Sequence, residues 1–583
     1  MISRFIKYNP TLLFGLSLFG IALNSCTEGQ ISAPPILVNN IGYDMSAKKI
    51  AMVTNIDADS FKVIDQNTGR AAYASVISGL SVFDPNSGDY VRSIDFTDLR
   101  NPGDYIISLN ESSRSSHAFK INESPYEDAA LAVLKSFYFS RCGTTVISEE
   151  WSHAVCHLKK AQHYEKNTSK TDATGGWHDA GDYNKFSVTH NISLAYLLHQ
   201  YLDNPFKYFD GQLNIPETGN TIPDILDEAQ WGINWLLKMQ HSNGGIHHKV
   251  SIKEWTGEHL PQNEDDPQYL FEVSSTATAG SAAVFALGAR VFEKFDPQFA
   301  EQLHQAAISA WKFLLDNPVT VPLGGFVNPP DVTGGEYGDN NDKDERLWAS
   351  VELFKLTGDP QYLEYFHSNY KDFWNGTLFA LTWQDMRNLS YYSYLSLDAD
   401  TPGINQEIHQ ELSGLLTTYA NRLLSQVDDN EYKYVLKKEE FYWGSNSVAA
   451  GYAFDLIQAY KFTNNSDYKE AALDQLHYLL GRNPLGISFV TGQGSKAVQN
   501  PYHQFSKLNS YRTAKPVPGL LVGGANYYSH LNNKPISEFT AKNYEDRFQN
   551  YMVNEPAINY TASLSYVLGY FSEFEQNQYK GTQ

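Results

Sequence analysis

Cysteine is scarce in this chain. There are 3 cysteines in 583 residues, so the fold cannot depend on a framework of many disulfides. Positive charge is also in short supply, because 44 Lys and Arg stand against 66 Asp and Glu, for a net charge of −22. That balance repels phosphate backbones and anionic lipid, and it argues against nucleic acid as a partner.

The composition is that of a folded protein with large cores. Hydrophobic residues make up 42% and charged residues 19%, which excludes a disordered or fibrous chain. The length predicts at least two domains. Aromatic residues reach 14%, and aromatic faces suit the apolar faces of sugar rings.

The N-terminus has the pattern of a secretory signal. Arg4 and Lys7 precede an apolar run at 11–23, which is too short to span a bilayer. The run ends in Leu-Asn-Ser-Cys, which resembles a bacterial lipobox, so we expect residues 1–25 to be removed, Cys26 to be acylated and 26–35 to form a tether. The alternative is an ordinary signal with a chance cysteine. Glu28 resembles part of the surface-export signal of Bacteroidetes lipoproteins. The expected location is therefore the outer membrane, facing the periplasm or the cell surface, with the lipid as the membrane contact.

Residues 36–122 read as short strands separated by turns. Strand-like runs occur at 50–53, 61–64, 90–96 and 105–109, with turn residues at 67–69 and 101–104. This spacing predicts an all-β, immunoglobulin-like sandwich.

Residues 123–583 change to a helical period. Between 222 and 237 the apolar residues form one face of an amphipathic helix. Three connections, at 296–299, 358–362 and 465–468, combine a helix end with Asp or Ser that can cap the next helix. Because no repeat of fixed period supports a solenoid, we expect an all-α barrel of helix pairs.

Three carboxyl groups are the first candidates for catalysis. Asp179 and Asp182 lie three residues apart in the glycine-rich stretch 175–183. Two such groups can hold one water, although a lone pair of Asp at this spacing is also a common turn feature. Glu555 lies among aromatic and apolar residues at 551–560, where burial raises a carboxyl pKa and suits a general acid.

Several segments of the chain, in order, resemble glycoside hydrolase family 9, the inverting cellulase-type enzymes with an (α/α)6 barrel, here with an N-terminal immunoglobulin-like domain. The segments are 36–43, 175–183, 443–447, 488–492, 516–524 and that around Glu555. The resemblance implies that Asp182 is the general base, Asp179 helps to hold the water and Glu555 is the general acid. It also implies substrate contacts from Trp177, Tyr502, His503, Gln504 and Tyr560.

Two metal sites are expected beside these carboxyl groups. Cys142, Cys156, His157 and His178 suit a closed, structural zinc site, as related family members with this β domain have. The alternative is a Cys142–Cys156 disulfide, which is common in exported proteins.

A second cluster suggests calcium. Asn340, Asn341, Asp344 and Glu345 lie in a run of oxygen-bearing side chains. The resemblance implies a calcium site there, with Asp385 as a further ligand. A solvated acidic helix N-terminus is the alternative.

One segment departs from the family pattern. Family cellulases usually carry Pro-His-His-Arg where this chain has Pro-Tyr502-His503-Gln504, so its subsites for the non-reducing side of the cut should differ. We expect an endo-acting inverting hydrolase of β-1,4-glucans, including mixed-linkage glucan or xyloglucan. The alternatives are an exo-acting β-glucosidase or β-glucosaminidase of the same family and a non-catalytic glycan-binding lipoprotein. A zinc hydrolase is disfavoured, because four protein ligands leave no position for water.

Overall fold

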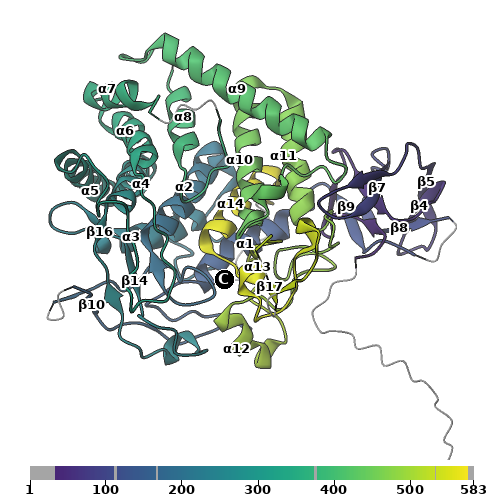
Figure 1. Cartoon of the computed structure of the whole chain (residues 1–583), viewed down its shortest axis with the longest axis horizontal. Coiled ribbons are helices and arrows are strands. Elements are labelled where there is room, and N and C mark those ends of the chain that lie inside the picture. The colour runs from purple at the N-terminus through teal and green to yellow at the C-terminus, as the bar shows by residue number, and fades with distance from the viewer. Residues whose placement is uncertain are drawn as a thin grey trace, which may run out of the picture.

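The structure is a computed structural model that describes residues 33–575, apart from 111–113, 166–168, 373–376, 399, 529 and 532–533. The expected signal peptide and Cys26 lie outside these residues. A small β domain stands beside a large ring of helices (Figure 1). In the described part of the chain, no helix has both the length and the apolar character that a membrane crossing requires.

The β domain is a sandwich of two sheets, as predicted. One sheet has the order β1-β3-β7-β6 and the other β2-β9-β8-β4-β5. On β8 the side chains of Tyr105, Ile107 and Leu109 alternate into the sandwich core. The strands are β1 (Ile36–Leu37), β2 (Gly42–Asp44), β3 (Ile50–Thr54), β4 (Ser60–Asp65), β5 (Ala71–Val76), β6 (Val82–Asp84), β7 (Asp89–Asp95), β8 (Gly103–Leu109) and β9 (Phe119–Asn122).

The larger domain is an (α/α)6 barrel, again as predicted. Helices α2, α4, α6, α8, α10 and α14 form the inner ring, and α1, α3, α5, α7, α9 and α11 pack outside it. The helices are α1 (Glu127–Phe139), α2 (Ser187–Asp203), α3 (Asp224–Met239), α4 (Ser275–Phe292), α5 (Pro297–Asp316), α6 (Lys343–Thr357), α7 (Pro360–Asn369), α8 (Arg387–Leu395), α9 (Gln406–Asp428), α10 (Ser445–Thr463), α11 (Ser466–Leu479), α12 (Gln504–Thr513), α13 (Tyr551–Asn554) and α14 (Ile558–Phe571).

Side-chain patterns separate the two rings. The inner helix α4 is rich in Ala, Gly, Ser and Thr and is buried along almost its whole length, whereas the outer helix α5 buries one face. Asp296 and Asp359 cap α5 and α7 through side-chain hydrogen bonds. At the third connection the cap is Asn465, one residue before the expected Ser466.

The barrel domain also contains short strands that the helical period did not predict. They form a sheet of order β11-β10-β15-β14-β12 and a pair β13-β16. These strands are too short to show a period of two, which is why the sequence pattern missed them. Their bounds are β10 (Ala161–His163), β11 (Lys170–Thr171), β12 (Lys185–Phe186), β13 (Ile246–His247), β14 (Lys249–Ser251), β15 (Tyr269–Leu270), β16 (Val273–Ser274), β17 (His530–Leu531) and β18 (Lys534–Pro535).

The two domains share a tight boundary. Leu37, Met52 and Val91 of the β1-β3-β7-β6 sheet are part of the hydrophobic core of the barrel. Asp89 on the same sheet accepts hydrogen bonds from Tyr432 Oη (2.6 Å) and Lys542 Nζ (2.6 Å). That sheet is therefore covered on both faces, by the second sheet and by the barrel.

Candidate active site

The glycine-rich loop between α1 and α2 carries two of the three carboxyl groups. Its backbone is held from several sides: His178 N donates to Ser140 O (2.7 Å), Asp179 N to Asn184 O (2.9 Å) and Ile558 N to Asp179 O (2.8 Å). Lys185 Nζ donates to the carbonyls of Ala173 and Gly175, both at 2.8 Å. The loop therefore presents its carboxyl groups from a fixed frame.

Asp179 lies deepest. Its side chain is buried, Oδ1 accepts a hydrogen bond from Thr189 Oγ1, and Oδ2 accepts one from Tyr337 Oη at 2.8 Å. Burial raises the pKa of Asp179 to about 7, although the two hydroxyl groups and their hydrogen bonds oppose that rise.

Asp182 is closer to solvent and is oriented by one residue. Asn184 donates to it twice, from its backbone N to Oδ1 (3.2 Å) and from Nδ2 to Oδ2 (2.6 Å). Burial raises the pKa of Asp182 to about 6, and the Asn184 hydrogen bonds and the charge of Lys249 oppose the rise.

Glu555 follows α13 and meets the same loop. Its Oε1 accepts a hydrogen bond from Gly181 N at 3.2 Å, and its carbonyl accepts one from Gly523 N at 2.9 Å. Burial, and then the nearby charge of Asp182, raise the pKa of Glu555 well above its ordinary value. Glu555 is therefore suited to remain protonated where Asp182 is ionised.

Glycine is required at position 181. A Cβ there would lie 2.2 Å from Tyr502 O and 3.0 Å from Glu555 Oε1. The missing side chain thus allows the loop with Asp179 and Asp182 to approach the segment with Glu555. This close approach brings together residues more than 370 positions apart in the sequence.

Three of the expected substrate contacts are buried in this structure. Trp177 and Gln504 are 0% exposed and His503 is 6% exposed. Trp177 Nε1 donates to Glu228 Oε2 (3.3 Å), and Gln504 Oε1 accepts from His259 N (2.9 Å). His503 Nδ1 pairs with Ser506 Oγ at 2.8 Å. These side chains face the protein interior, so they support the loops of the site without reaching a glycan.

Tyr502 and Tyr560, in contrast, stay partly exposed beside the carboxyl groups. The Tyr502 ring would be 2.6 Å from a Cβ at Gly181, and its backbone N donates to Asn554 O at 2.8 Å. The charges of Glu555 and Asp179 both act on the Tyr560 hydroxyl, whose pKa is raised chiefly by burial. Both rings can therefore contact a molecule held between Asp182 and Glu555.

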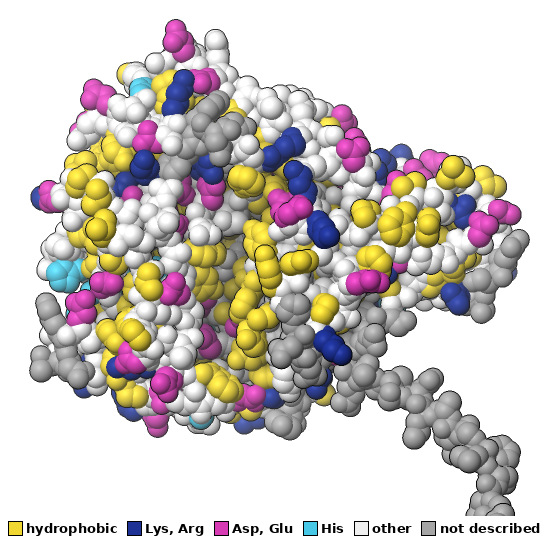
Figure 2. All heavy atoms as spheres, in the orientation of Figure 1, with side chains coloured by type: hydrophobic (Ala, Val, Ile, Leu, Met, Phe, Trp, Pro, Cys, Tyr) yellow, Lys and Arg dark blue, Asp and Glu magenta, His cyan; other side chains and the backbone are white. Residues whose placement is uncertain are grey.

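A row of aromatic rings extends from the acid, and the sequence did not single it out as a glycan surface. Trp443 is 42% and Tyr551 43% exposed, and their ring centroids are 5.5 Å apart. The ring centroid of Tyr551 is 5.7 Å from that of Tyr502, and the ring centroid of Tyr502 is 4.9 Å from that of Phe548. Figure 2 shows a band of hydrophobic side chains down the centre of this face of the barrel. Of this row, the sequence named Tyr502 as a substrate contact and placed Trp443 within a family segment.

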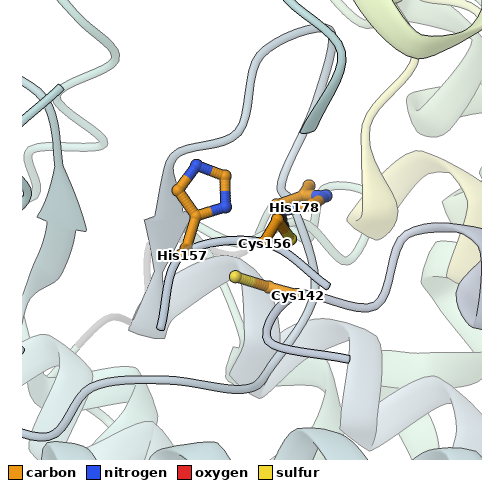
Figure 3. Close-up of side chains that lie close together, drawn as sticks. All are labelled: Cys142, Cys156, His157 and His178. Carbon is orange, nitrogen blue, oxygen red and sulfur yellow. Dashed lines mark hydrogen bonds between the residues drawn. The ribbon is translucent and has the colours of Figure 1, made fainter. Parts of the chain in front are cut away.

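The cysteines and histidines converge on one point (Figure 3). Ligand atoms of Cys142, Cys156, His157 and His178 all lie within 4.8 Å of one another, and both cysteines are free thiols. The disulfide considered as an alternative is therefore absent between these two residues. Among the described residues, this is the group of His, Cys, Asp and Glu side chains whose ligand atoms already converge closely enough for one metal ion.

The surroundings fit a metal ligand set. His157 Nε2 and Glu264 Oε2 are 3.0 Å apart, and the carboxylate fixes the proton on that nitrogen. His157 Nδ1 is then left buried without a hydrogen-bond partner, facing the thiols. His157 also has a φ of +50°, a conformation that costs a non-glycine residue about 1–3 kcal/mol. A bound cation would take His157 Nδ1 as a ligand, and the metal–ligand bond would offset the energetic cost of this backbone conformation.

The expected calcium ligands meet only in part. Asp344 and Glu345 are buried at the start of α6, and Asp344 Oδ2 accepts from Met386 N at 2.6 Å. Asp385 instead forms an ion pair with Arg387, and Asn340 is exposed.

Buried acidic oxygens without hydrogen-bond partners nevertheless remain at this position. Asp339 Oδ2 and Glu345 Oε2 are buried without partners. Burial and the neighbouring acidic groups raise the pKa of Asp339 to about 6 and that of Asp344 to about 8. Oxygen donors of this kind suit a hard cation.

Known proteins share both halves of this chain. The family described as "Glycosyl hydrolase family 9" matches residues 126–568, and "Cellulase N-terminal ig-like domain" matches 32–114. "Endoglucanase D" of Acetivibrio thermocellus is 32% identical over 97% of this chain and 86% of its own length. "Xyloglucan-specific endo-beta-1,4-glucanase BoGH9A" of Bacteroides ovatus is 29% identical over 95% of this chain and 96% of its own length.

Solved structures agree with these sequence matches. A metagenome-derived family 9 endoglucanase superposes with a TM-score of 0.86 at 32% identity, covering 92% of this chain and 99% of that one. A "Zn-binding triple mutant" of endoglucanase J30 superposes with a TM-score of 0.84 at 32% identity, covering 91% of this chain and 100% of that one. The chain therefore belongs to glycosyl hydrolase family 9, and it is a glycoside hydrolase of the endoglucanase type with an N-terminal immunoglobulin-like domain.

Proposed function

We propose that the enzyme hydrolyses β-1,4-glucosidic bonds with inversion, using Asp182 as general base and Glu555 as general acid. The observation that supports these roles is the arrangement of the two carboxyl groups around Gly181. Both are in one site, but their pKa values are pushed apart: that of Asp182 is about 6, while that of Glu555 is raised by burial and by Asp182 itself. Such a pair supplies one base and one acid at the same pH.

The reaction then proceeds by a single displacement. Asp182 takes a proton from a water molecule as the water oxygen bonds to the anomeric carbon. Glu555 gives its proton to the glycosidic oxygen as the bond from that oxygen to the anomeric carbon breaks. Asp179, whose oxygens are held by Thr189 and Tyr337, orients the same water. Trp443, Tyr551, Tyr502 and Tyr560 supply ring faces for the glucan on either side.

The test is replacement of each carboxyl group by its amide. Asp182→Asn and Glu555→Gln should each lower kcat on a soluble β-glucan by about 10²–10⁴-fold, the usual worth of general acid–base catalysis. Glu555→Gln should recover on substrates with activated leaving groups, which need no proton. Asp265→Asn is the control, because that carboxylate is 88% exposed and pairs with Lys159 on the surface. Normal turnover by Asp182→Asn, or retention at the anomeric carbon by NMR, would contradict the proposal.

The substrate class we propose is soluble β-glucan, including xyloglucan or mixed-linkage chains. The support is the named activity of the Bacteroides ovatus relative together with the altered segment at Tyr502 and Gln504. Since Gln504 is buried against the backbone of His259, its effect on specificity would pass through the loop around His259. Lys507 pairs with Glu258 of that loop at 2.6 Å. Two measurements test this choice: product analysis on a panel of glucans, and a comparison of exo with endo cleavage.

We also propose that the Cys142, Cys156, His157 and His178 set holds a structural zinc ion. Two thiols and two imidazoles fill a tetrahedral shell, and Glu264 orients His157 from outside it. The ion would stiffen the loop at His178, next to Asp179. For the acidic group at Asp339, Asp344 and Glu345, with Asn340, Asn341 and Asp385 nearby, we propose calcium, which would neutralise the buried charge at the start of α6.

The location of the enzyme is a further proposal. Cys26 would carry a lipid that anchors the enzyme to the outer membrane, facing the periplasm or the cell surface. The supports are the lipobox-like sequence and Glu28. Replacing Cys26 by Ser, followed by fractionation of cells, tests whether the lipid determines the location.

A further inference from the structure

A lysine is buried beside the catalytic base. Lys249, on β14, is 0% exposed, and its Nζ donates to Asn328 Oδ1 (2.6 Å) and to Gly335 O (2.8 Å). Both of these acceptors are neutral. The ammonium also lies over the rings of Phe186, Phe271 and Phe326, at 5.5, 4.6 and 5.6 Å from their centroids. A buried ammonium is costly unless the surroundings compensate it, so its position calls for an explanation.

The acceptors of Lys249 belong to the segment that leads to Tyr337. Gly335 is two residues before Tyr337, whose hydroxyl donates to Asp179 Oδ2. His248, the residue before Lys249, contacts the same segment. Its Nε2 donates to Glu336 O at 3.0 Å, and its Nδ1 forms a hydrogen bond with Ser274 Oγ at 2.8 Å. Lys249 of β14 and the residue before it, His248, therefore hold both residues that precede Tyr337.

Tyr337 needs such restraint. Its φ is +49°, in the left-handed region, which costs a non-glycine residue about 1–3 kcal/mol. The ring is held between Phe186 and Trp383, at centroid distances of 4.7 and 5.1 Å. A relaxed backbone at this position would move the hydroxyl away from Asp179.

The same lysine is linked to Asp182 through the sheet. β14 pairs with β12, with Phe186 opposite Lys249. Directly after β14 ends, Ile252 N donates to Asn184 Oδ1 at 3.1 Å, and Asn184 in turn donates to Asp182. The charge of Lys249 also opposes the effect of burial on the pKa of Asp182. Burial lowers the pKa of Lys249 itself to about 8, so the ammonium is charged at neutral pH.

We propose that Lys249 is a positioning residue for the catalytic carboxyl groups: its ammonium holds segment 335–337, and so the Tyr337 hydroxyl, against Asp179. The inference rests on the roles proposed above for Asp179 and Asp182. Lys249 touches no reacting atom and acts only through these neighbours. A lysine with a purely structural role would stabilise the fold without affecting the titration of Asp182.

The pH profile separates these two roles. The charged and titratable groups that act on Asp182 are Lys249, Glu264 and Glu555, with Asp179 and Tyr502 beside them. Lys249 is the positive member, and the carboxyl groups all act in the opposite direction. Removing this charge should move the acid limb of the kcat/KM profile toward higher pH.

The experiment compares Lys249→Met, Lys249→Arg and Lys49→Met in the full-length enzyme. Lys49→Met is the matched control, because Lys49 is also 0% exposed and donates only to carbonyl groups, those of Asp44, Met45 and Ala47, in the β domain. Lys249→Met should lower kcat about tenfold and move the acid limb upward. Lys249→Arg, which retains the charge, should keep the limb in place. Lys49→Met should lower Tm alone.

A second variant covers the case in which Lys249→Met does not fold. Tyr337→Phe removes one hydroxyl and keeps the ring, and it should lower kcat without changing KM. An unchanged kcat in Tyr337→Phe, or a Lys249→Met enzyme that loses Tm but keeps both kcat and its pH profile, would overturn the inference. The proposed function fails separately, through full activity of Asp182→Asn. If Asp182→Asn is inactive while Lys249→Met keeps the kcat and the pH profile of the wild type, only the role of Lys249 is refuted.

Discussion

Asn184→Ala offers a direct measurement of how the base is tuned. The side chain of Asn184 donates to Asp182 Oδ2 at 2.6 Å, and its loss leaves only the longer backbone contact at 3.2 Å. A hydrogen bond to a charged group contributes about 1.5–3 kcal/mol, and one pKa unit corresponds to about 1.4 kcal/mol. Because Asp182 is partly exposed, the lower end applies, and its pKa should rise by about one unit.

The effect on activity depends on pH. With a pKa of about 6, half of the wild-type Asp182 is ionised at that pH. With a pKa of about 7, about a tenth of the variant would be ionised there, so kcat/KM should fall about fivefold. The loss should shrink as pH rises above both values, because the base is then ionised in both enzymes. The sign follows from the base being active only when deprotonated.

The assay is the initial rate on a soluble β-glucan between pH 4 and 8, with Tm measured at each pH so that unfolding is not mistaken for titration. Asn184 Oδ1 also accepts from Ile252 N, so Tm should fall slightly. A variant whose acid limb coincides with that of the wild type, or lies below it, would refute the reasoning that Asn184 holds Asp182 in its ionised form. A uniform loss at every pH would assign Asn184 to geometry alone.

The remaining predictions concern the metals and the glycan surface. Cys156→Ser should abolish the binding of one zinc ion per chain and lower Tm by several degrees, whereas a Cys142–Cys156 disulfide found by mass spectrometry would contradict the zinc site. Adding calcium to calcium-depleted enzyme that retains its zinc should raise the Tm of the wild type but not that of Glu345→Gln, and a wild type insensitive to calcium would refute that site. Trp443→Ala should raise KM for a polymeric glucan about 3- to 10-fold. Phe206→Ala is the control, because Phe206 follows α2 and is 86% exposed. Equal KM values in the two variants would show that Trp443 is not part of the glycan surface.

The order of the strands and helices could be read from the sequence because it depends on local pattern. The period-two runs of the β domain became β3, β4, β7 and β8, and the apolar face at 222–237 became α3. The helix caps at Asp296 and Asp359 also followed from local hydrogen-bonding chemistry. The short strands of the barrel loops were missed, since a strand of two or three residues has no period to detect.

Site residues were predictable where chemistry requires a particular side chain. The grouping of Cys142, Cys156, His157 and His178 followed from residue type and from the family pattern. Sequence position does not reveal which way a side chain points, and the structure places the Gln504 amide against the backbone of His259.

Local periodicity and motifs that are continuous along the chain were enough to predict the two domains, the family and the three candidate carboxyl groups. The tuning of those carboxyl groups depends on tertiary contacts. Gly181 must lack a side chain for the loop of Asp182 to meet Glu555, and burial then raises both pKa values. Tyr337 reaches Asp179 from one segment, and Lys249 comes from a strand that pairs with β12. Burial and contacts between distant segments exist only once the barrel has closed, which is why no local pattern could show them.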